Sequence, residues 1–152
     1  AGAVYLYHAG FAAAYFAYDE YYALEGTHSD ISITVTRNDD IYSGDLVLEY
    51  ATSDLTATGV DTTKFNLCMN MATNLRGSAK CGDYEQTSGN LVIPSGSNQA
   101  GFKVRIMNDL CHERFLKYVQ ITLSVPGGGV LQSEALSAKL RIDDDDFLEQ
   151  EC

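Results

Sequence analysis

Residues 31–37 (ISITVTR) and 45–53 (DLVLEYATS) place an apolar side chain at every second position. The side chains of a strand point alternately to its two faces, so this period predicts strands with one buried face. Further runs continue the pattern between polar turns, at residues 89–96, 100–109, 117–125 and 135–143. No segment shows a convincing helical period. Regularly spaced short strands with polar turns predict an all-β fold, an antiparallel β-sandwich.

The charge of the chain limits the classes of partner. There are 10 basic and 21 acidic residues, which give a formal net charge of −11 and a pI near 4.4. Binding to nucleic acid or to an anionic membrane surface needs a basic face, so neither is expected. No segment approaches the roughly 20 apolar residues of a membrane span. Divalent cations are the expected partners.

The four cysteines point to disulfides. Residues 60–84 are too long for a hairpin and contain Cys68 and Cys81. We predict an insertion around residues 60–82 that these two cysteines close, with Cys111 and Cys152 as the second pair. Four cysteines allow three pairings, and four reduced thiols remain an alternative. An even count without a C-x-x-C pair fits an oxidising, extracellular compartment.

The last predicted strand runs into four consecutive aspartates, residues 143–146. Side chains on a strand alternate faces, so strand geometry would point Asp143 and Asp145 one way and Asp144 and Asp146 the other. Negative charge at this density is unfavourable unless water or a cation offsets it. Other carboxylates lie at the ends of predicted strands or beside turns, namely Glu25, Asp83, Asp109 and Glu113.

Strand-end carboxylates of this kind suit calcium, which binds six to eight oxygen ligands in flexible geometry. No EF-hand loop is present. Loops that meet at one pole of a sandwich supply ligands from several strands, so the sequence predicts a distributed calcium site. The alternative for each acidic residue is a solvated turn carboxylate, which we favour for Asp54 and Asp61.

Catalytic patterns are absent from the sequence. His8, His28 and His112 are far apart, and no G-x-S-x-G, H-E-x-x-H or phosphate-loop motif occurs. A serine could be combined with His112 and an aspartate as a triad, but any chain of this length permits that combination. We therefore expect a protein that is not an enzyme.

The order of several short motifs resembles the Calx-beta family over roughly residues 16–146. The motifs are YYALEG (21–26), ITVTR (33–37), YATSDLTA (50–57), KCGDY (80–84), LVIPSG (91–96), IMND (106–109) and IDDDD (142–146). The resemblance implies an immunoglobulin-like sandwich of about seven strands with calcium bound at one pole. It also separates a domain at residues 16–152 from an N-terminal extension, residues 1–15.

Carried over by position, the resemblance also gives the calcium ligands. They are Glu25, Asp83, Asp109, Glu113, Asp144, Asp145 and Asp146. Two departures from the family pattern, Asn108 and Leu116, occupy positions where an acidic residue is usual, so one calcium ion is expected. Asp61 remains an alternative to Asp83, because the insertion makes the alignment ambiguous there.

The N-terminal extension is rich in aromatic residues. The first 22 residues contain eight of the sixteen aromatics and only two charges. Residues 4–7 alternate as a strand that is apolar on both faces, so we expect it to add to a sheet of a neighbouring subunit. The assembly candidates are Val4, Tyr5, Leu6, Tyr7 and Phe11. An extra edge strand of the same sandwich and a short helix at residues 9–17 are the alternatives.

These features favour an extracellular, calcium-stabilised structural or adhesion protein, a homo-oligomeric subunit of a head-to-tail filament or matrix. One alternative is a calcium-sensing regulatory module, which needs reduced thiols in the cytosol. Another is a calcium-dependent carbohydrate-binding module. No N-x-[ST] sequon occurs, so glycans, if present, are O-linked.

Overall fold

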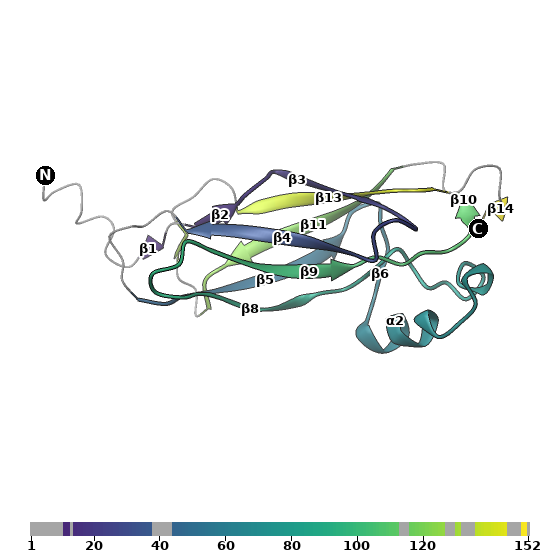
Figure 1. Cartoon of the computed structure of the whole chain (residues 1–152), viewed down its shortest axis with the longest axis horizontal. Helices are drawn as coiled ribbons and strands as arrows, with labels where there is room; N and C mark the ends of the chain where they lie inside the picture. Colours follow the sequence, from purple (N-terminus) through teal and green to yellow (C-terminus); the bar gives the residue numbers. More distant parts are fainter. Residues whose placement is uncertain are drawn as a thin grey trace, which may run out of the picture.

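The computed structural model describes residues 11–12, 14–37, 44–112, 116–126, 130–131, 136–145 and 150–151. Two sheets form an elongated β-sandwich (Figure 1). The smaller sheet has the order β2 (Ala14–Phe16), β4 (Asp30–Arg37), β9 (Gln99–Arg105). The larger sheet has the order β3 (Glu20–Leu24), β13 (Ser137–Asp143), β11 (Lys117–Ser124), β5 (Leu46–Asp54), β8 (Ser88–Ile93). The predicted all-β sandwich is confirmed.

Strand pairing within the two sheets is antiparallel with one exception. β3 pairs in parallel with β13, from Glu20 opposite Lys139 to Leu24 opposite Asp143. The chain crosses from the smaller sheet to the larger one between β2 and β3, so the first strand of the sandwich contributes to both layers. β3 and β13 therefore end side by side, at the same edge of the larger sheet.

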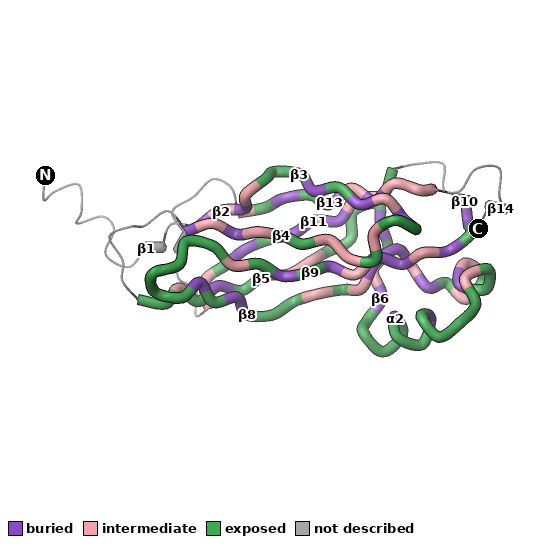
Figure 2. Tube along the Cα trace, in the orientation of Figure 1, coloured by how far each residue is buried: buried purple, intermediate pink, exposed green. Residues whose placement is uncertain are grey.

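The core lies between the two sheets (Figure 2). Ile33 and Val35 of β4 are fully buried, as the alternation at residues 31–37 predicts. Across the sandwich, Tyr50 of β5 stacks on Phe102 of β9 with ring centroids 3.8 Å apart. Gly89 of β8 lies beside this ring, and a Cβ there would approach the Tyr50 hydroxyl to 3.0 Å. A large aromatic is thus accommodated opposite a residue without a side chain.

The insertion contains a helix that the sequence did not predict. α2 (Thr62–Met69) is capped by Asp61, whose Oδ1 accepts a hydrogen bond from the Lys64 amide at 2.7 Å. η1 (Thr73–Leu75) follows. Only Phe65 and Cys68 of α2 are buried, and two positions in eight residues are too few to show a helical period. The predicted disulfide between Cys68 and Cys81 is confirmed.

Three short parallel pairs complete the described structure. They are β1 (Phe11–Ala12) with β12 (Val130–Leu131), β6 (Gly59–Val60) with β7 (Tyr84–Glu85), and β10 (Cys111–His112) with β14 (Gln150–Glu151). β1 lies at one end of the sandwich, whereas α2, β10 and β14 lie at the other (Figure 1).

The N-terminal extension is described only from Phe11 onward. β1 and β2 are strands, so the helix considered for residues 9–17 is wrong at the described positions. Phe11 pairs with Val130 of the same chain. The remaining assembly candidates, Val4 to Tyr7, lie outside the described residues.

Candidate metal centre

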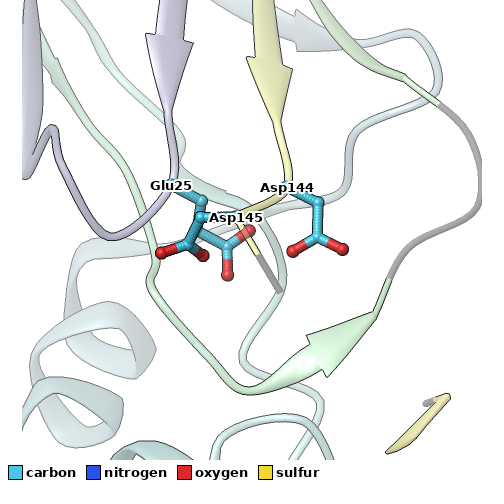
Figure 3. Close-up of side chains that lie close together, drawn as sticks. All are labelled: Glu25, Asp144 and Asp145. Atoms are coloured by element: carbon cyan, nitrogen blue, oxygen red, sulfur yellow. The ribbon is translucent and has the colours of Figure 1, made fainter. Parts of the chain in front are cut away.

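Three carboxylates converge where β3 and β13 end. Glu25 directly follows β3, and Asp144 and Asp145 directly follow β13. Because these strands are parallel neighbours, the Glu25 amide donates a hydrogen bond to the carbonyl of Asp143 at 2.9 Å. One carboxylate oxygen from each of Glu25, Asp144 and Asp145 lies within 4.8 Å of the other two (Figure 3). Such a group can hold a metal ion.

Gly26 makes room for one of these carboxylates. Its φ is +82°, a conformation that favours glycine, and a Cβ at this position would lie 2.0 Å from Oδ2 of Asp145. The Glu-Gly pair of the first motif therefore has two functions. Glu25 contributes a carboxylate, and Gly26 lets Asp145 approach it.

The alternation of faces considered for the four aspartates does not separate Asp144 from Asp145, which converge as their assignment to one ion requires. Strand geometry ends at Asp143, so the alternation of faces does not continue into the next two residues. Asp143 instead forms an ion pair with Nε of Arg141 at 3.0 Å. Asp146 lies outside the described residues. The run of aspartates is thus divided between an ion pair on β13 and the convergent group.

Two further carboxylates are held by backbone amides: Asp109 is joined to the group through Glu25, and Asp83 lies close enough to Asp109 to raise its pKa. The Asp109 amide donates to Oε1 of Glu25 at 2.9 Å, and Oδ1 of Asp109 accepts from the Cys111 amide at 2.9 Å. Oδ2 of Asp83 accepts from the Thr58 amide at 2.7 Å. Glu25 and Asp109 are only 3% and 5% exposed. These contacts fix carboxylates from three separate loops at one pole.

Negative charge is concentrated at this pole. The pKa of Asp109 is raised, mainly by burial and also by the charges of Asp83 and Asp144. Its hydrogen bonds with Cys111 and Glu25 act in the opposite direction. Oδ1 of Asp145 is buried and has no hydrogen-bond partner among the described residues. A buried carboxylate oxygen without a partner is costly. A cation would offset this cost.

The remaining acidic candidates have other positions. Glu113 lies outside the described residues. Asp61, the alternative to Asp83, is exposed and caps α2. Asp54, for which we predicted simple solvation, accepts hydrogen bonds from the Gly59 amide at 2.9 Å and from the Tyr84 hydroxyl at 2.6 Å.

Arg76 is a residue of this region that sequence reasoning missed. It is buried, and its Nη1 donates to the carbonyl of Asn108 at 2.8 Å. Its Nη2 lies 3.3 Å from the carbonyls of Met69 and Met71. An arginine in a polar insertion carries no sequence signal for burial, because its partners are main-chain carbonyls.

Disulfide-bonded cysteines flank two of the carboxylates. Cys81 precedes Asp83 by two residues, and Cys111, which is also disulfide-bonded, follows Asp109 by two residues. The expected partner of Cys111, Cys152, lies outside the described residues. No free cysteine occurs in the described part of the chain, which argues against the alternative of reduced thiols.

Comparison with solved structures identifies the fold. The chain is similar to the apo form of the Calx CBD1 domain, with a TM-score of 0.65 and 25% identity over 90% of this chain and 99% of that chain. It is also similar to the calcium binding domain CBD12 of CALX1.1, with a TM-score of 0.65 and 26% identity over 88% of this chain and 46% of that chain. The Calx CBD2 domain shares the fold at a TM-score of 0.61 and 15% identity, over 87% of this chain and 86% of that chain. The resemblance to Calx-beta domains is therefore confirmed.

The sequence itself matches no protein-family model and no curated protein. Within the described residues, no helix has the length and apolar character that a membrane crossing requires.

Proposed function

We propose that this chain, which has the Calx-beta fold, is a calcium-binding module that stabilises an extracellular structural or adhesive assembly. The observation that carries the calcium proposal is the convergence of Glu25, Asp144 and Asp145 within 4.8 Å. The similarity to a calcium binding domain and the unpartnered Oδ1 of Asp145 support it.

The donor set fits calcium. All of the candidate ligands are carboxylate oxygens, which hard cations prefer. Glu25, Asp144 and Asp145 would hold the ion. Asp109, whose amide binds Glu25, and Asp83, whose carboxylate accepts from the Thr58 amide, are proposed as further ligands. Glu113 and Asp146 remain candidates from outside the described residues. The bound ion would neutralise like charges and connect loops that are distant in sequence.

Calorimetric titration of the full chain with calcium, and thermal melts with calcium or chelator, test this proposal. We expect binding and a higher midpoint with calcium. Asp145→Asn should weaken binding at least tenfold. Asp19→Asn is the control, because it removes the same charge from an exposed position outside the group. Equal melting midpoints with calcium and chelator would show that the site does not stabilise the fold.

The extracellular setting rests on the cysteines. Cys68, Cys81 and Cys111 are all disulfide-bonded, which suits an oxidising compartment. A calcium-sensing module is the second candidate, favoured by the similarity to the Calx domains. Small-angle scattering with and without calcium separates the two. A static module gains stability at constant shape, whereas a sensor changes its shape.

Assembly through residues 1–10 completes the proposal. This segment has no carboxylate and is apolar on both faces of a strand. It precedes β1, which lies at the end of the sandwich opposite α2 and β10 (Figure 1). A strand donated to the next subunit gives a head-to-tail contact that does not close on itself, hence a filament. Deletion of residues 1–10 should yield a monomer by light scattering.

A further inference from the structure

Among the described residues, no strand pairs with the outer edge of β8. β8 is the last strand of the larger sheet, and it contains no charged residue and no proline. Exposed edges usually carry charges, proline or bulges, because unpaired main-chain groups attract another strand. Six uncharged residues whose outer side pairs with no described strand are suited to strand addition.

The register shows which main-chain groups of β8 face outward. The Thr52 amide donates to the carbonyl of Thr87 at 2.9 Å, in line with the pairing of β5 and β8. Hydrogen-bonded pairs alternate along an antiparallel ladder, so Gly89, Leu91 and Ile93 also bond to β5. The amides of Ser88, Asn90 and Val92 therefore point to the open edge.

The solvent face beside this edge is apolar at the Ile93 end of β8, whereas Ser88 and Asn90 make it polar toward the start of the strand. Val92 is 43% exposed, and Val47, directly opposite it on β5, is 41% exposed. On the other face, Leu91 and Ile93 are buried in the core. A strand added to β8 would lie beside Leu91 and Ile93 on its core face and beside Val92 on its solvent face. This arrangement matches a segment that is itself apolar on both faces.

The other edges of the two sheets are less suited to addition. β9 carries Lys103, and its Arg105 is held by Glu85 at 2.9 Å and covers Phe65 of α2. β3 begins at Glu20, which lies 3.9 Å from Arg141. β2 has only three residues.

We propose that the β8 edge accepts residues 3–9 of a second copy of this chain as an added strand. This inference rests on the assembly proposed above and names its acceptor. Six strand residues span about 20 Å, and ten extended residues reach at most about 36 Å, so the segment is long enough. The donor carries no carboxylate, so its insertion brings no additional negative charge to the edge of a chain whose net charge is −11.

Two variants of the full chain block this edge. Asn90→Pro removes an outward amide but no bond to β5, a position where an edge strand tolerates proline. Val92→Lys places a charge beside the incoming strand. Lys103→Pro is the matched control on β9. The Arg37 amide donates to the carbonyl of Asn98, and bonded pairs alternate along the ladder of β4 and β9. The Lys103 amide therefore faces away from β4, as the Asn90 amide faces away from β5. Circular dichroism and thermal melts check that each variant folds. If Asn90→Pro does not fold, the result for Val92→Lys tests the proposal.

Light scattering after size exclusion, at concentrations where the wild type assembles, gives the result. We expect both β8 variants to fall to the single-chain mass of 16.6 kDa, whereas Lys103→Pro assembles like the wild type. If the folded β8 variants assemble normally while deletion of residues 1–10 gives a monomer, the assignment of β8 as acceptor is wrong. Assembly through residues 1–10 is then still supported. If Lys103→Pro disrupts assembly and the β8 variants do not, β9 is the acceptor. A wild type that is monomeric at high concentration overturns both proposals.

Discussion

Nη1 of Arg76 lies 2.8 Å from the carbonyl oxygen of Asn108, the residue before Asp109. This contact connects the disulfide-closed insertion to the loop that carries a candidate calcium ligand. The same guanidinium reaches the carbonyls of Met69 and Met71. Arg76 of the insertion therefore braces the loop of the candidate metal centre by a side chain that is not itself a ligand.

Replacement of Arg76 should affect both stability and calcium binding. Arg76→Met leaves three carbonyls without their donor, so we expect a loss of about 2–3 kcal/mol in the free energy of unfolding. Calcium affinity should fall as well, because the Asn108 backbone is no longer held. Urea denaturation and calorimetric titration measure the two effects. Lys64→Met, an exposed change of the same charge on α2, should alter neither by more than a few tenths of a kcal/mol.

Gly26→Ala should impair calcium binding more than its backbone strain alone predicts. The added Cβ occupies the position of Oδ2 of Asp145, so this carboxylate must leave the group. Gly96→Ala is a matched control, because Gly96 has the same φ of +82° but a Cβ added there would meet no atom within 4 Å. Each variant should lose about 1 kcal/mol or more from strain. Only Gly26→Ala should weaken calcium affinity, and equal affinities in the two variants would contradict this assignment.

The disulfide between Cys68 and Cys81 should stabilise the fold by about 3 kcal/mol, because it closes a loop with a sequence separation of 13. The double variant Cys68→Ala/Cys81→Ala removes it. We expect a lower urea midpoint and weaker calcium binding, since Asp83 follows the loop directly. Peptide mapping without reduction should recover Cys68 and Cys81 in one linked peptide. A different linkage would refute the pairing.

Glu85 should make stability depend on pH. Its hydrogen bonds with Arg105 lower the pKa of this carboxyl. A lowered pKa in the folded state gives stability above the unfolded pKa, near 4.3, and this stability is lost as pH falls through the folded pKa. The difference in unfolding free energy between the wild type and Glu85→Gln should therefore be largest near neutral pH and shrink in acid. Denaturation in chelator at several pH values measures it, and a constant difference would contradict the ion-pair explanation.

The sequence predicts the strands well because one buried face leaves a period of two. Residues 31–37 and 117–125 show this period, and both lie in central strands. α2 escaped prediction because its neighbours bury only Phe65 and Cys68. The sequence pattern within each strand also did not predict that β3 pairs in parallel with β13, because this pairing joins segments that lie far apart in the sequence.

Part of the candidate site could also be predicted from the sequence. Acidic residues at the ends of predicted strands indicate that carboxylates gather at one end of the sandwich, and Glu25, Asp144 and Asp145 do so. Their geometry depends on where β13 ends, and a run of identical aspartates does not reveal that position. Arg76 was missed because its carbonyl partners leave no trace in the sequence.

The parallel pairing of β3 and β13 has a mechanical consequence. One strand lies near the start of the sandwich and the other near its end, so tension applied through the two ends of the domain pulls them past each other. The hydrogen bonds from Glu20 to Leu24 would then be loaded together in shear instead of opening one after another. Glu25 and Asp144 lie just beyond the ends of the two strands, so an ion shared between them would act as a lock on that sliding motion. A domain with this pairing would resist stretching along its long axis.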